Sequence, residues 1–296
     1  MSYSILKTDP TLTDAVRRIA RSQIEAAIAE IDDPQLDPVT TVHQLRKRCK
    51  KLRGLIRLVR PGLAAYAEEN AAFRDLARSL ADLRDAGAVL ETLGALEERF
   101  GDVVGGTFFA DAGEALRAAS PPPKAAAVKA RLKAARKAFG DALERTGSWK
   151  VKGKAANVLA AGVAMTYKRA ARDMATAAKS GTPEDFHEYR KWVKYHWYQL
   201  RLLRHIWPKV IHARIAEARH LADELGDHHD FAIFRMEVLP GLDCADERVC
   251  EVLGGLIEAE EERLEPACLK HGKRLFAEDP DSFGKRVGAY WKAWRD

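Results

Sequence analysis

Two segments of the chain carry rows of basic side chains that could bind a polyanion. In the first segment, His43, Arg46, Lys50, Arg53 and Arg57 follow one another at three- and four-residue steps. On an α-helix these steps bring side chains to one face, about 5–6 Å from one another. Arginine offers paired donors to phosphate oxygens, and lysine offers a mobile positive charge. The spacing therefore predicts a row of cations that could bind a chain of anionic groups.

The second segment repeats this row 144 residues later, and both segments lack acidic residues. No Asp or Glu occurs in residues 39–67 or 189–215, whereas a basic face that is merely solvated generally mixes both signs. Tyr195 and Trp197 stand where the first copy has Lys51 and Arg53, so the second binding face is expected to differ in shape. The candidate ligand-binding residues are His43, Arg46, Lys47, Lys50, Lys51, Arg53, Arg57, His187, Arg190, Lys191, Lys194, Arg201 and Arg204.

A second pair of matching motifs lies downstream of the two basic segments. Residues 76–85 and residues 221–230 both read L-x-x-x-L, followed by a basic residue and an aspartate. Two motifs in the same order, at nearly the same spacing, indicate an internal duplication. We predict that Asp85 and Asp230 orient basic side chains of the rows, with Arg84 and His229 beside them.

Composition and periodicity predict an all-α fold around these rows. The 296 residues are 47% apolar and 31% charged, and Ala, Leu, Glu, Arg and Lys dominate, which favours helix and a globular core. Each repeat half, residues 1–146 and 147–296, is expected to form a bundle of about four or more helices. The first helix is expected to be capped by Thr11 or Thr13 and to end near Ile31. Further helices are expected at residues 39–61, 64–99, 108–118, 124–145, 155–179, 184–206, 210–238, 247–276 and 282–294, with a turn at 120–123 and a bend near Gly226.

The cysteines and the hydropathy pattern predict a soluble protein of a reducing cytoplasm. Cys49, Cys244, Cys250 and Cys268 form no C-x-x-C pair and are expected to be reduced, structural thiols. No segment approaches the roughly 20 apolar residues of a membrane span, and the N-terminus lacks the apolar run of a signal peptide. The net charge is +6, so the concentration of charge in two helices is more informative than its total.

The H-x-x-R-K-x-x-K pattern of residues 43–50 and 187–194 resembles that of the CHAD family, the conserved histidine α-helical domain. The resemblance spans nearly the whole chain, residues 1–296, as a single domain. It implies two helical bundles related by a pseudo-twofold axis, with the basic residues of both lining a central groove or pore. It also implies binding of inorganic polyphosphate and association with polyphosphate granules, without a cofactor.

Two other functions are weighed against non-catalytic polyphosphate binding. A nucleic acid could bind the basic helices, with Trp192, Trp197 and Tyr198 stacking on bases, although helical spacing makes these rings better candidates for the core. A metal-dependent phosphohydrolase could use residues 228–230, together with His187 or His220, as metal ligands. The first copy, however, has the cation Arg84 next to Asp85 at the equivalent place, which favours an ion pair over a metal site. We therefore predict no metal ligands and no catalytic residues.

The two motif histidines predict a dependence of binding on pH. His43 and His187 are expected to be neutral at pH 7 because neighbouring cations oppose protonation. A bound phosphate would favour the imidazolium, so affinity is expected to rise as the pH falls from about 8 to about 6, and His43→Ala is expected to flatten this rise.

Overall fold

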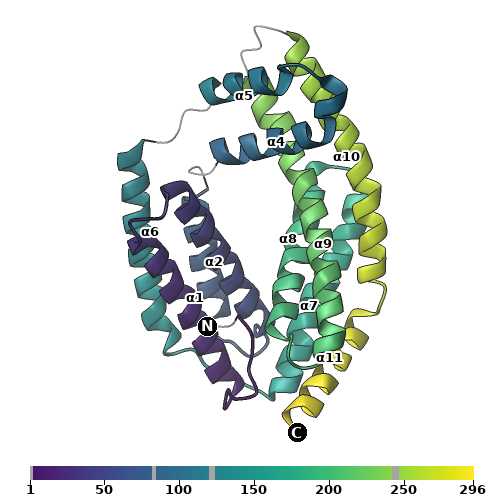
Figure 1. The fold of residues 1–296 in the computed structure, drawn as a ribbon. Helices are drawn as coiled ribbons and strands as arrows, with labels where there is room; N and C mark the ends of the chain where they lie inside the picture. Colours follow the sequence, from purple (N-terminus) through teal and green to yellow (C-terminus); the bar gives the residue numbers. More distant parts are fainter. Residues whose placement is uncertain (1–2, 82–84, 120–123, 242–246) are drawn as a thin grey trace.

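Eleven α-helices account for most of the computed structural model, which describes residues 3–81, 85–119, 124–241 and 247–296 (Figure 1). Within these ranges there is no β-sheet, and one isolated bridge joins Leu63 and Val151. The predicted all-α fold is confirmed. No helix in the described ranges has the length and apolar content that a membrane crossing requires. The helices are α1 (Leu12–Asp32), α2 (Pro38–Leu58), α3 (Tyr66–Ser79), α4 (Asp85–Val104), α5 (Phe108–Ala119), α6 (Ala125–Thr146), α7 (Ala155–Ser180), α8 (Pro183–Leu202), α9 (Pro208–Ile233), α10 (Glu247–Leu275) and α11 (Pro280–Arg295).

The two basic segments form α2 and α8, and both helices begin with the same local chemistry. The side chain of Asp37 accepts a hydrogen bond from the backbone N–H of Thr40, and that of Thr182 accepts one from Asp185. A proline occupies the first turn of each helix, where its missing N–H costs no hydrogen bond. These caps fix where each basic row begins.

The single helix expected over residues 64–99 is wrong, because the structure divides it into α3 and α4. Helix α3 ends at Ser79, and Leu80 leaves the helical conformation with φ −104° and ψ 2°. Leu80 packs into the core shared with α1 and α2, whereas Leu93 and Leu96 of α4 pack into a separate core. One straight helix could not serve both cores. The expected turn at 120–123 lies outside the described residues.

The second core joins the two halves of the chain. Helices α4 and α5 lie across the top of Figure 1, where they pack on each other and α4 contacts α9 and α10. Leu96 and Phe109 from the first half share this core with Phe231, Phe234 and Ile257 from the second. Residues of the first half are therefore divided between two cores. The internal duplication and the boundary near residue 146 stay predictions.

Helices α2 and α8 approach closely at Gly54. A Cβ atom at this position would lie 2.9 Å from the Cβ of Tyr198, closer than side chains tolerate. Because glycine has no Cβ, the two helix backbones can meet here. The approach brings the two basic rows within reach of one another.

Helix α9 runs through Gly226 without a break in the helix, whereas a bend was expected there.

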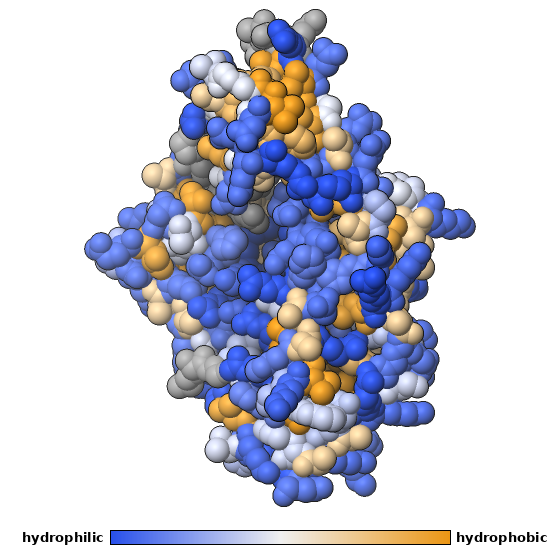
Figure 2. Space-filling view, turned by 45° about the vertical axis from the view of Figure 1, so that its right-hand side comes forward, coloured by the Kyte–Doolittle hydropathy of each residue, from blue (hydrophilic) through white to orange (hydrophobic). Residues whose placement is uncertain are grey.

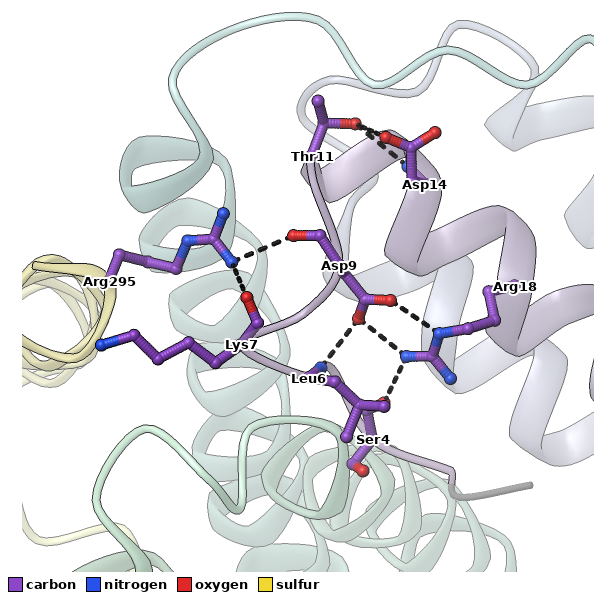
Figure 3. Close-up of polar contacts among 8 residues, drawn as sticks. All are labelled: Ser4, Leu6, Lys7, Asp9, Thr11, Asp14, Arg18 and Arg295. Carbon is purple, nitrogen blue, oxygen red and sulfur yellow. Dashed lines mark hydrogen bonds and ion pairs between the residues drawn. The ribbon is translucent and has the colours of Figure 1, made fainter.

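The N-terminal segment connects α1 to α8 and α11 (Figure 3). Asp9 is buried and accepts two hydrogen bonds from the guanidinium of Arg18, at 2.6 and 2.7 Å. Arg295, near the end of α11, donates to the backbone carbonyl of Asp9 at 3.0 Å. The backbone N–H of Ile5 donates to the carbonyl of Leu202 at 2.9 Å. These contacts tie both halves of the chain to one segment.

The prediction of reduced cysteines is wrong for Cys250, which is disulfide-bonded. Cys49 and Cys268 are free and buried, as predicted. Cys244 lies outside the described residues. The prediction rested on the missing C-x-x-C spacing, but a disulfide requires only that two Cα atoms come within about 7 Å, which folding can achieve at other separations.

Candidate functional site

A cleft lined by basic side chains lies among α2, α3, α8 and α9, and we call it the basic cleft. It encloses about 430 Å³. Among the described residues, eight Lys or Arg side chains and two carboxylates line it, so these residues give it a large positive excess. Figure 2 shows hydrophilic side chains around a hollow near the middle of one face. The lining residues are Arg46, Lys50, Arg53, Arg74, Ala77, Arg78, Ala81, His187, Glu188, Arg190, Lys191, Lys194, Tyr195, Tyr198, His229 and Asp230.

The basic cleft brings together the middle of both predicted rows. Helix α2 supplies Arg46, Lys50 and Arg53, and α8 supplies the matching cations around Arg190 and Lys194. All of these side chains are partly exposed, so their charged ends can reach a ligand. The cleft therefore offers cations from two helices that are far apart in the sequence.

Helix α3 orients the arginines of α2. The guanidinium of Arg46 donates to the carbonyl oxygen of Ala77 at 3.0 Å, and Nε of Arg53 donates to Oδ1 of Asn70 at 3.1 Å. The guanidinium of Arg53 also lies 5.6 Å from the centre of the Tyr195 ring. Neutral partners fix these arginines without cancelling their charge.

Helix α9 makes room for Arg190 at Gly226. A Cβ atom on Gly226 would lie 3.2 Å from Nη2 of Arg190. Because this contact is tighter than most Cβ contacts in proteins, a larger residue at this position would require the guanidinium to shift by a few tenths of an ångström. Lys191, the next residue on α8, forms an ion pair with Glu188, one of the two carboxylates of the cleft.

Two histidines face each other in the basic cleft. Nδ1 of His187 and Nδ1 of His229 are 3.2 Å apart, so one ring donates a proton and the other accepts it. Burial, followed by the charge of Arg190, lowers the pKa of His187. Burial, followed by His187 and Arg190, lowers the pKa of His229 to about 3. Both rings are therefore neutral at pH 7, which agrees with the prediction for His187, although burial outweighs the neighbouring cations as the cause.

Comparison with known proteins assigns the chain to a family. A model of the CHAD domain matches residues 18–238, which include both basic segments. The chain belongs to the CHAD family. The crystal structure of the CHAD domain from the plant Ricinus communis is similar, with 19% sequence identity and a TM-score of 0.62. The alignment covers 94% of this chain and 96% of that chain, and at this identity it shows a shared fold. A comparison with curated proteins found no match.

Two predicted residues at the start of this CHAD domain's first motif lie outside the lining of the basic cleft. His43 and Lys47 are exposed on α2, and neither contributes to the lining. In the second motif, the corresponding His187 and Lys191 both line the cleft. The first turn of the motif therefore faces the basic cleft in the second copy but not in the first.

Lys51 and Arg201 lie together at a different place, beside the N-terminal segment. Nζ of Lys51 lies 5.7 Å from the centre of the Tyr3 ring, and the guanidinium of Arg201 lies 5.6 Å from it. Arg201 also lies 4.9 Å from the Trp197 ring. Burial, followed by the charges of Arg48 and Arg201, lowers the pKa of Lys51 to about 8. The structure separates this pair from the basic cleft.

Arg57 is buried inside the protein. Its guanidinium lies 4.4 Å from the Tyr195 ring and 5.1 Å from the Trp192 ring, and it donates a hydrogen bond to the hydroxyl of Tyr66. Only 9% of Arg57 is exposed, so aromatic rings take the place of a ligand around it. Arg57 follows Gly54 on α2, and beyond this close approach the basic stripe enters the helix interface.

The remaining predicted residues lie beyond α8, in the basic cleft, or outside the described part of the chain. Arg204 lies beyond α8 and donates to Nε2 of His205 at 3.2 Å, outside the cleft. Asp230 lines the basic cleft, as does His229. Arg84 lies outside the described residues. Asp85 begins α4, and its side chain is likewise outside them.

Sequence reasoning missed the contribution of α3. Arg74 and Arg78, one helical turn apart, line the basic cleft, and Asn70 orients Arg53. The available signal was the four-residue spacing of the two arginines. It was obscured because Asp75 lies between them, which made α3 resemble an ordinary solvated helix.

Proposed function

We propose that this CHAD protein binds inorganic polyphosphate in the basic cleft. The observation that carries the proposal is the convergence of eight cations from three helices on one cleft with two carboxylates. Polyphosphate carries about one negative charge per phosphate unit, and arginine and lysine match its oxygens. Cations spaced along two helices suit a repeating anion better than a single small phosphate.

The surroundings of the aromatic rings favour polyphosphate over single-stranded nucleic acid. The guanidinium groups of Arg57 and Arg169 lie 5.1 and 5.4 Å from the centre of the Trp192 ring. Trp197 lies 4.9 Å from Arg201, and Tyr198 is buried. Bases need exposed ring faces for stacking. These three rings are already engaged within the protein, and Tyr195 and Tyr198, which line the cleft, are buried, so among the described residues the cleft offers charge but little exposed ring surface.

We also propose that binding is not followed by hydrolysis of the polymer. Of the carboxylates among the described lining residues, Glu188 is paired with Lys191 and the other is Asp230. A phosphohydrolase generally assembles several carboxylates or histidines around metal ions. Recruitment of the protein to polyphosphate granules in the cytoplasm would follow from binding alone, and co-localisation with stained granules would test it.

Calorimetric titration with long-chain polyphosphate tests the proposed ligand. We expect saturable binding that weakens steeply with added salt, because bound cations displace counterions from the polymer. Single-stranded DNA at equal phosphate concentration and ionic strength should compete poorly. Phosphate release should be undetectable with or without divalent metal. Absence of binding, or equal competition by the DNA, would refute the proposal, and metal-dependent phosphate release would refute its non-catalytic part.

A further inference from the structure

A cluster of histidines and glutamates lies between α9 and α10, away from the basic cleft. Glu217, His220 and Glu224 follow one another on α9 at three- and four-residue steps, which places them on one face of the helix. His271 reaches this face from α10, which packs against α9. None of these four side chains lines the basic cleft.

Three potential ligand atoms of this cluster converge. One ring nitrogen of His220, one carboxylate oxygen of Glu224 and one ring nitrogen of His271 all lie within 4.8 Å of one another. Nε2 of His220 is 3.3 Å from Oε1 of Glu224, and Nδ1 of His271 is 3.0 Å from Oε2 of Glu224. Bonds of about 2.0–2.1 Å to a tetrahedral zinc ion place neighbouring ligand atoms about 3.3–3.4 Å apart. The two contacts are close to this spacing, but they involve different oxygens of Glu224, so the carboxylate would bind the ion through both oxygens or after a small rotation.

The fourth residue supplies the support that a metal-binding histidine usually has. Nε2 of His271 lies 3.0 Å from Oε2 of Glu217, so this nitrogen can donate its proton to a carboxylate. That donation leaves a lone pair on Nδ1, which faces the oxygen of Glu224 at 3.0 Å. Two acceptors at this distance require a proton or a cation between them. In zinc sites, the ring nitrogen of a histidine ligand that does not bind the metal often donates a hydrogen bond to a carboxylate.

We propose that His220, Glu224 and His271 bind a zinc-like divalent transition metal ion, with Glu217 orienting His271. Two imidazoles and one carboxylate suit Zn²⁺, whereas Mg²⁺ prefers oxygen ligands. The side chain of His220 is 68% exposed, so water can reach the remaining coordination position and His220 can adjust to the ion. Sequence analysis considered His220 as a metal ligand only together with residues 228–230. It did not connect His220 with His271, because the two are 51 residues apart and only the packing of α9 on α10 joins them.

Zinc titration of untagged, chelator-treated protein tests the site without polyphosphate present. We expect one Zn²⁺ per chain, an increase in melting temperature on binding, and a visible spectrum of four-coordinate Co²⁺ when cobalt replaces zinc. His220→Ala should lose at least about tenfold in zinc affinity, as should His271→Ala, and Glu217→Gln about tenfold. Because the His220 side chain is largely exposed, His220→Ala should keep the fold, with an unchanged melting temperature in the absence of zinc.

Two control variants make the assignment specific. His212→Ala removes another exposed histidine of α9, and His187→Ala removes a histidine of the basic cleft. Both should bind zinc like the wild type. No zinc binding by the wild type would overturn the proposal. Equal affinity in His220→Ala, or loss in His187→Ala alone, would also overturn it. Polyphosphate titration of metal-free His220→Ala should match the wild type, so the two proposals fail independently.

Discussion

The imidazole rings of His187 on α8 and His229 on α9 face each other in the basic cleft, with their Nδ1 atoms 3.2 Å apart. Burial lowers the pKa of both rings, and their mutual proximity and Arg190 add to the effect at His229. The pair is therefore neutral and rich in hydrogen-bonding capacity when no ligand is bound. A polyanion placed against it would reverse the electrostatic balance and favour protonation.

Polyphosphate binding should therefore take up protons through this pair. A bound phosphate raises the pKa of His187 from its lowered value, so affinity should rise as the pH falls from about 8 to about 6. His187→Ala should flatten this rise more than His43→Ala, because His43 lies outside the cleft lining. Titrations in buffers of different ionisation enthalpy would measure the protons taken up. Equal uptake by His187→Ala and the wild type would contradict the assignment.

A buried histidine elsewhere should make the fold sensitive to acid. His196 is fully buried among Tyr167, Phe276 and Phe283, and burial lowers its pKa to about 3. Below the ordinary histidine pKa of about 6.5, the unfolded chain binds a proton that the folded chain excludes, so stability falls as the pH falls toward 3. The loss is about 1.4 kcal/mol per pH unit.

The His196→Leu variant isolates this contribution. Between pH 7 and pH 5, the wild type should lose about 2 kcal/mol more than the variant in the free energy of unfolding by urea. Leucine has a similar volume, and it also removes two ring nitrogens that have no hydrogen-bond partner within the described part of the chain. Parallel pH profiles for the two proteins would show that His196 is protonated in the folded state.

Gly226→Ala should separate stability from binding. Alanine in the middle of a helix is favoured over glycine by up to about 1 kcal/mol, so α9 should become more stable. The new Cβ would lie 3.2 Å from Nη2 of Arg190, so that guanidinium would have to shift by a few tenths of an ångström from its position in the cleft. We expect a raised melting temperature together with about a three- to tenfold weaker affinity for polyphosphate. An unchanged affinity would show that Arg190 does not contact the ligand from its present position.

Arg78→Ala tests the cations that α3 contributes. Each cation that neutralises a phosphate adds roughly 0.7–0.9 to the slope of log affinity against log salt concentration, by analogy with nucleic acids. Loss of Arg78 from the cleft should lower this slope by about that amount. Lys133→Ala removes an exposed lysine of α6, outside the cleft, and should leave the slope unchanged. Equal slopes for Arg78→Ala and the wild type would show that Arg78 of α3 does not contact the polymer.

Most helix boundaries could be predicted from local signals. Thr11 caps α1, and Pro38 and Pro183 begin the two basic helices, because caps and prolines act within a few residues of themselves. The break after Ser79 could not be predicted in this way. The apolar spacing continues past Leu80. Only the tertiary structure shows that the residues before the break pack into one core and the residues after it pack into another.

The basic rows were visible in the sequence, but their surroundings were not. Helical spacing placed Arg46, Lys50 and Arg53 on one face, and they do line the cleft together. The same spacing included Arg57, which aromatic rings of α8 cover. A periodicity identifies a face of a helix, yet it cannot show which part of that face another helix will bury. Arg78 was missed for the opposite reason, since its own helix mixes both signs.

Binding of long-chain polyphosphate by a variant that lacks four cleft cations is the most direct test of the proposed function. Arg46, Lys50, Arg190 and Lys194 are replaced by alanine, and a control replaces the exposed lysines Lys129, Lys133, Lys152 and Lys154, which removes the same net charge. Charged hydrogen bonds contribute on the order of 1.5–3 kcal/mol each. After allowance for screening by solvent, we predict that the cleft variant loses about a hundredfold or more in affinity at constant salt, while the control loses only a few-fold. Equal losses in the two variants would show that net charge, and not the basic cleft, holds the polymer.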